Sequence, residues 1–104
     1  MNTPHETLTL RVSGDLLSTN AESVRKESTG LFEAAGKASQ KWNTFRLDLT
    51  SAKMVDSVGL NLIVTLLKHV EKSGARMQIA YSDQNVQRTF VFTRLEQRVE
   101  LVKG

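Results

Sequence analysis

The chain has 104 residues, of which 39% are hydrophobic, so we expect residues 1–104 to form one domain around a single core. It contains no cysteine, which excludes disulfides, a thiolate nucleophile and cysteine-based metal centres. The net charge of +3 comes from basic residues that are interleaved with acidic ones, so we expect no nucleic-acid binding.

The start of the chain is polar and leads into an alternating segment. Residues 1–6 do not resemble a signal peptide, and the apolar runs of the strongest helix candidate are too short to span a membrane. We therefore expect a cytoplasmic protein without membrane insertion. Residues 7–13 alternate polar and apolar side chains, which predicts a half-buried strand, and Gly14 and Asp15 then indicate a turn.

A first helix is predicted from about Asn20 to Gly36. Its start fits a capping box, in which Thr19 closes the first turn and Glu22 reaches back, and a glycine at position 36 can end it. The side chains that recur at helical spacing form one face, namely Ala21, Val24, Ser28, Leu31, Phe32 and Ala35.

A polar connection and a second strand follow. Residues 37–43 are predicted to form a loop, in which Trp42 is expected to fold back on the body of the protein. Residues 45–49 alternate again and predict the strand, and residues 50–54 form a short approach to the next helix.

The second predicted helix begins at the pair Asp56 and Ser57, either of which can cap it, and ends at Ser73-Gly74. One narrow polar stripe runs along it, consisting of Asn61, Thr65, Lys68 and Lys72. The apolar arc is wider than the roughly 100° with which a surface helix faces a core. Part of it is therefore interpreted as partner surface, with Leu62 and Leu66 as candidates and their burial in the core as the alternative.

The remaining segments complete the alternation of strands and helices. Residues 77–81 predict a third strand, Ser82 or Asp83 caps a shorter helix that carries Val86 and Phe90, and residues 99–102 predict a last strand. This order favours an α/β fold with successive β-α units and a mostly parallel sheet of four to five strands, joined by right-handed crossovers.

Ser57 is the leading candidate for a functional group, because it lies beside a carboxylate where a strand leads into a helix. A nucleophile elbow needs glycines two positions before and two after the serine, and Val55 occupies the first of these positions. His5 and His69 are not placed as a base for this serine. A serine hydrolase is therefore a distant alternative, and no catalytic residue is assigned.

No metal or cofactor site is predicted. Asp48 and Asp56 can approach each other across the strand-to-helix turn, but no histidine or spaced acidic loop accompanies them. Gly59 stands alone, so a phosphate-binding glycine loop is missing. The simplest alternative interpretation makes Asp56 and Ser57 a helix cap and Gly59 a site of close packing.

Segments along nearly the whole chain together resemble the STAS domain of bacterial anti-sigma-factor antagonists. The most specific of them is Asp56-Ser57-Val58-Gly59-Leu60 in its strand-to-helix context. The others are Val12-Ser13-Gly14-Asp15-Leu16, Leu47-Asp48-Leu49, Gly74 before Met77-Gln78-Ile79-Ala80, and Val86-Gln87-Arg88-Thr89-Phe90 with Leu95. The chain departs from the family pattern at Leu17, where an acidic residue is frequent, and in a longer connection at Gly36–Asn43.

The resemblance implies that the family's phosphorylated serine corresponds to Ser57, with Asp56, Val58, Gly59 and Lys53 around it. It implies a partner-binding surface that includes Asp15, Leu16, Ser18, Thr19, Asn61, Leu62 and Leu66. The implied partners are an anti-sigma-type serine kinase, which binds the ATP itself, and a PP2C-type phosphatase, so the chain would be a substrate and not an enzyme. A STAS scaffold or lipid-transport accessory subunit without phosphorylation is the alternative.

Overall fold

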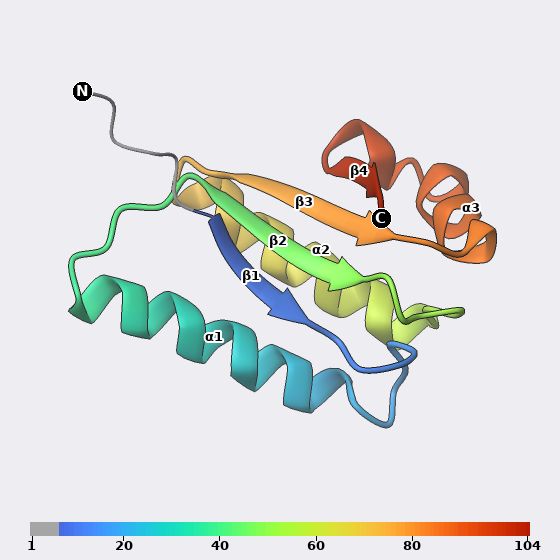
Figure 1. Cartoon of the computed structure of the whole chain (residues 1–104), viewed down its shortest axis with the longest axis horizontal. Helices are drawn as coiled ribbons and strands as arrows, with labels where there is room; N and C mark the ends of the chain where they lie inside the picture. Colours follow the sequence, from blue (N-terminus) through green and yellow to red (C-terminus); the bar gives the residue numbers. More distant parts are fainter. Residues whose placement is uncertain (1–6) are drawn as a thin grey trace.

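The computed structural model describes residues 7–104, in which strands and helices alternate (Figure 1). The order is β1 (Thr7–Arg11), α1 (Ala21–Lys37), β2 (Thr44–Leu49), α2 (Ser57–Lys72), β3 (Arg76–Tyr81), α3 (Gln84–Phe92), the short 3-10 helix η1 (Leu95–Gln97) and β4 (Glu100–Lys103). The polar start at residues 1–6, with His5, lies outside the described residues. The predicted elements are thus all found, and η1 is an addition to them.

The described strands form one four-stranded sheet in the order β1-β2-β3-β4, and all three pairings are parallel. Each strand lies beside the next one in the sequence, so each helix crosses over once between neighbours, as the alternation predicted. This α/β sheet confirms the predicted fold class. Its carboxyl edge collects the loops that follow β1 and β2, and Ser57 begins the helix after the second of these loops.

One face of the sheet carries the apolar core. Alternate residues of the two central strands are fully buried there, among them Phe45, Leu47 and Ile79. Helix α2 packs on β3 and on α1, and α1 also contacts β1. Burial of both strand and helix side chains in this single cluster supplies most of the stabilisation.

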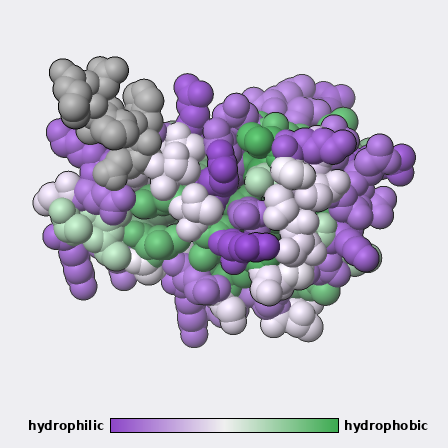
Figure 2. All heavy atoms as spheres, viewed as in Figure 1, coloured by the Kyte–Doolittle hydropathy of each residue, from purple (hydrophilic) through white to green (hydrophobic). Residues whose placement is uncertain are grey.

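The opposite face of the sheet is polar. Thr9, Arg46, Gln78 and Glu100 lie in register across the strands. Arg46 Nε donates to Gln78 Oε1 at 3.0 Å, and Gln78 Nε2 donates to Glu100 Oε1 at 2.9 Å. In Figure 1 the strands lie in front of α2, and Figure 2 shows mostly hydrophilic and intermediate side chains on the face seen from this side. The described helices leave this face open.

The predicted ends of the first helix need two corrections. The capping box is wrong: Asn20 is the N-cap residue, and Glu22 forms an ion pair with Arg25 instead of reaching back. Gly36 does not end the helix, because α1 continues to Lys37 and the left-handed residue that follows is Ser39, with φ of 52°. The connection to β2 is correspondingly shorter than the predicted one.

Aromatic side chains close the space beneath this connection. The Trp42 ring stacks on Phe32 with centroids 5.4 Å apart, and Phe32 in turn contacts Phe45 edge to face at 5.0 Å. His69 stacks on the Phe32 ring as well, at 4.4 Å. Trp42 therefore folds back onto the body of the protein, as predicted.

Candidate functional site at the start of helix α2

Ser57 is the first residue of α2, and its side chain is exposed. The sequence left open whether Asp56 or Ser57 caps the helix, and the structure assigns this role to Asp56, whose backbone is extended. Among residues 7–104, no hydrogen bond involves the Ser57 hydroxyl. The Ser57 hydroxyl therefore does not cap the helix that Ser57 begins.

The Asp56 carboxylate holds two segments together. Its Oδ1 accepts the N–H of Gly59 at 2.8 Å and thereby caps α2, while its Oδ2 accepts the N–H of Ser18 in the loop after β1, also at 2.8 Å. The N–H groups of Gly59 and Ser18 favour the ionised form and hold the pKa of Asp56 below its ordinary value. Asp56 is thus ionised at neutral pH and accepts hydrogen bonds from both segments.

The loop after β1 and the loop after β2 are joined at several further points. The Asp15 carboxylate accepts the N–H of Lys53 at 2.7 Å and that of Met54 at 3.2 Å. Leu16 and Val55 form an isolated parallel bridge, in which Leu16 N–H donates to the Met54 carbonyl at 3.1 Å. These bonds extend the parallel pairing past the sheet and fix the approach to Ser57.

Gly59 allows this close approach. A Cβ at this position would lie 2.6 Å from the Leu16 carbonyl oxygen and 3.1 Å from a Val55 methyl carbon. The first contact is shorter than real Cβ atoms show and involves backbone, and the second is tight enough that the Val55 side chain would have to shift. The close-packing interpretation of Gly59 is therefore confirmed, and it links the start of α2 directly to the loop after β1.

Asn20 explains why the first helix lacks its predicted cap. Its Oδ1 accepts the Leu17 N–H at 2.8 Å and its Nδ2 donates to the Asp15 carbonyl at 2.9 Å. The side chain is thus used to close the loop that contacts Asp56, and it does not bond to the first turn of α1. Residues 14–20 are ordered by their own polar side chains as well as by the neighbouring loop.

The residues predicted to bind a partner fall into two groups. Those with accessible side chains around Ser57 are Asp15, Ser18, Thr19 and Asn61. Those that are buried are Leu16, Leu62 and Leu66. The interpretation of Leu62 and Leu66 as partner surface is wrong, and the alternative, their burial in the core, is confirmed. Helix α2 packs on both the sheet and α1, so its wide apolar arc is covered on two sides. The exposed polar stripe of α2 is confirmed.

The exposed apolar side chains beside Ser57 are different ones. Val58 is 45% exposed and Met54 is 57% exposed. Sequence reasoning named Val58 as a neighbour of the serine but missed Met54, which lies in an irregular segment where periodicity carries no signal. Together with exposed Lys53, they form an accessible rim at the start of α2.

The described residues place no histidine next to the Ser57 hydroxyl. His69 lies twelve residues after Ser57 in the same helix, roughly 18 Å along its axis, and stacks on Phe32. Residues 7–104 contain no cluster of three or more His, Asp or Glu side chains suited to a metal ion. None of the helices in the described part of the chain is long and apolar enough to cross a membrane.

These features define a parallel α/β protein with an exposed serine at a strand-to-helix junction. The chain belongs to the STAS domain family, whose model matches residues 1–103. This assignment confirms the resemblance seen in the sequence. A search of curated proteins finds no match to the chain.

Solved structures share the fold. A candidate anti-sigma factor antagonist from Thermotoga maritima, TM1081, superposes with a TM-score of 0.79 at 24% identity, over 94% of this chain and 80% of that one. The anti-sigma factor antagonist SpoIIAA in its unphosphorylated form gives a TM-score of 0.63 at 22% identity, over 88% of this chain and 79% of its own. At these identities the likeness is one of fold.

Proposed function

We propose that the chain is an anti-sigma-factor antagonist of a partner-switching pathway and that Ser57 is its phosphoacceptor. The observation that carries the proposal is that two neighbouring residues have different roles at the start of α2. Asp56 caps the helix, and the Ser57 hydroxyl is exposed and has no hydrogen bond among the described residues. Membership of the STAS family and the names of the structural neighbours support the same function.

A phosphate at this position is compatible with the fold. Ser57 lies at a helix N-terminus, where the helix dipole favours an anion, so modification does not require unfolding. The phosphate adds roughly −1.5 to −2 charges next to the ionised Asp56. A partner that buries this surface would then face like-charge repulsion and a desolvation cost, and we expect its affinity to fall about a hundredfold.

In this proposal the catalytic groups belong to the partners. An anti-sigma-type serine kinase binds the unphosphorylated chain, transfers the phosphate from its own ATP to Ser57 and releases the product, and a PP2C-type phosphatase restores the hydroxyl. The proposed contact residues with accessible side chains are Asp15, Ser18, Thr19, Asn61 and Val58, and the proposal assigns to exposed Lys53 the task of offsetting part of the phosphate charge. Asp56 and Gly59 act as positioning residues.

The test is phosphorylation with the purified anti-sigma-type kinase of the same genome. Incubation with ATP should add one phosphate, and mass spectrometry of the peptides should place it on Ser57, while Ser57→Ala should stay unmodified. An unmodified wild-type chain that remains in a tight complex would support a STAS scaffold instead. Labelling of Ser57 by a serine-directed covalent inhibitor would support a hydrolase.

A further inference from the structure

Helix α3 exposes large apolar side chains at its carboxyl-terminal end. Phe92 is 90% exposed and Val91 is 48% exposed, whereas Val86 and Phe90 of the same helix are fully buried. The inner face of α3 therefore already anchors it to the core, and Phe92 adds nothing to that anchoring. A phenylalanine held almost fully in water is a candidate for burial against another molecule.

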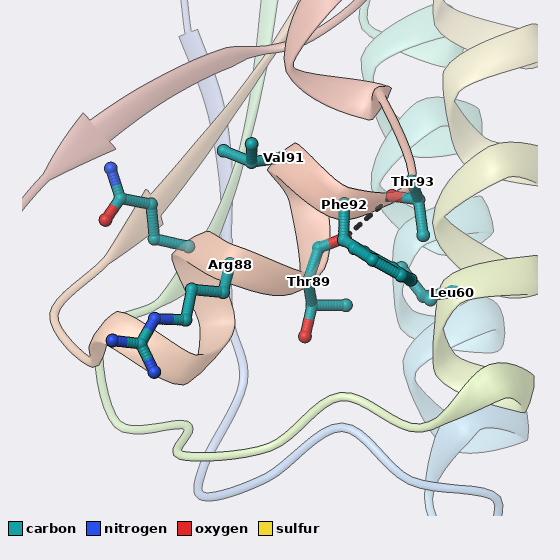
Figure 3. A pocket seen from close by; sticks show the side chains of 7 residues that line it. Leu60, Arg88, Thr89, Val91, Phe92 and Thr93 are labelled. Carbon is teal, nitrogen blue, oxygen red and sulfur yellow. Dashed lines mark hydrogen bonds between the residues drawn. The ribbon is translucent and has the colours of Figure 1, made fainter.

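Phe92 borders an open groove of about 680 Å³ between α3 and α2. The lining residues are Leu60, Gln87, Arg88, Thr89, Val91, Phe92 and Thr93. In Figure 3 the Phe92 side chain extends from α3 toward Leu60 of α2. The Thr93 hydroxyl donates a hydrogen bond to the Thr89 carbonyl at 2.8 Å. The hydroxyls of Thr89 and Thr93 are thus satisfied within the helix, and the surface of the groove is mainly apolar.

The α2 side of the groove lies close to Ser57 along the helix. Leu60 lies three residues after Ser57 in α2, and side chains at this spacing are neighbours on a helix. On the other side of the serine, Val58 and Asn61 line a separate shallow groove toward α1. A protein that covers the Ser57 hydroxyl therefore reaches the Phe92 groove within one helical turn.

The groove has a single charged side chain in its lining, that of Arg88. The ion pairs between residues 7 and 104 are Arg25–Glu22 and Arg98–Glu71, so Arg88 has no acidic partner among them. An unpaired guanidinium at the rim of an apolar groove is complementary to a segment that carries a carboxylate next to an apolar side chain.

We propose that this groove is the second half of the docking surface and receives an apolar side chain, flanked by a carboxylate, from the kinase that docks at Ser57. The inference rests on the proposed function, because it takes its partner from there. It adds Phe92, Leu60 and Arg88 to the contact surface. Phe92 is the anchor, since large aromatic side chains near the centre of an interface carry a large share of the binding energy.

The test is a titration of the purified anti-sigma-type kinase of the same genome with variants of the full chain. Phe92→Ala should weaken binding about tenfold to a hundredfold and leave the thermal midpoint of unfolding unchanged, because the side chain is exposed. Phe92→Leu should retain most of the affinity. Arg88→Glu should weaken binding more at low than at high salt. The control is Lys41→Glu, because Lys41 is exposed and lies before the start of β2, whereas Ser57 follows the end of that strand; this variant should bind like the wild type.

Ser57→Asp, measured in parallel, separates this inference from the proposed function. Weak binding of Ser57→Asp together with wild-type affinity of Phe92→Ala would overturn the groove and leave the switch intact. Wild-type affinity of Ser57→Asp would overturn the switch itself. A change of oligomeric state in Phe92→Ala at wild-type affinity would assign the groove to a second copy of the chain, and the inference would then be wrong.

Discussion

The Asp56 carboxylate accepts the backbone N–H of Ser18 at 2.8 Å, across 38 positions of sequence. The same carboxylate caps α2 through Gly59, so one side chain orders both the helix that begins with Ser57 and the loop that lies beside it. The surface around the serine is therefore a composite of two loops, and its geometry depends on Asp56.

Asp56→Ala should destabilise the protein more than the removal of an ordinary helix cap. It loses the Gly59 and Ser18 contacts together, and we expect the thermal midpoint to fall by roughly 8–16 °C, about twice the shift expected for one cap contact. Asp83→Ala is the matched control, because Asp83 caps α3 through the single N–H of Asn85. An equal loss in both variants would show that the link to Ser18 contributes nothing.

The pH dependence of stability should report the same contacts. The pKa of Asp56 is lowered in the fold, mainly by the Gly59 N–H, so its contribution is fully present above the unfolded pKa and is lost as pH falls through the folded one. We expect the free energy of unfolding to decline below about pH 4, and less steeply in Asp56→Asn. Urea titrations across this range check it. Asp48, whose pKa is lowered mainly by the Thr50 hydroxyl, contributes in the same direction, so Asp48→Asn should be measured as well.

Gly59→Ala should disturb the junction while Gly30→Ala should not. The new methyl at position 59 would lie 2.6 Å from the Leu16 carbonyl, and the loop must shift at a cost of about 1–3 kcal/mol. At position 30 of α1 nothing lies within 4 Å of a new Cβ, so alanine should stabilise the helix by about 0.5–1 kcal/mol. Denaturant unfolding of both variants measures the contrast. Stabilisation by Gly59→Ala would contradict the close approach.

The strands and helices were predictable because their patterns are local. Alternation at residues 45–49 and the polar stripe of α2 translate directly into a buried and an exposed face. A cap at Asp56 or Ser57 follows from the neighbouring sequence in the same way, and the structure selects Asp56. These local patterns are sufficient to place Ser57 at the start of a helix.

The parts that sequence missed depend on contacts between distant segments. Leu62 and Leu66 are buried because α1 lies against α2, and a helical wheel does not show how many neighbours a helix has. The hydrogen bond from the Ser18 N–H to the Asp56 carboxylate joins two loops, and the periodicity of the sequence does not predict that these loops lie close together. Phe92 was missed for a related reason, because its exposure is decided by how α3 is oriented on the sheet.

The central claim is that charge at position 57 controls release of a kinase partner. The most direct measurement is a calorimetric titration of the purified anti-sigma-type kinase with wild-type chain, Ser57→Ala and Ser57→Asp. We expect Ser57→Ala to bind like the unphosphorylated wild type, because the hydroxyl is exposed and makes no hydrogen bond within the described residues, and Ser57→Asp to bind about a hundredfold more weakly. Equal affinities of the two variants would contradict the switch.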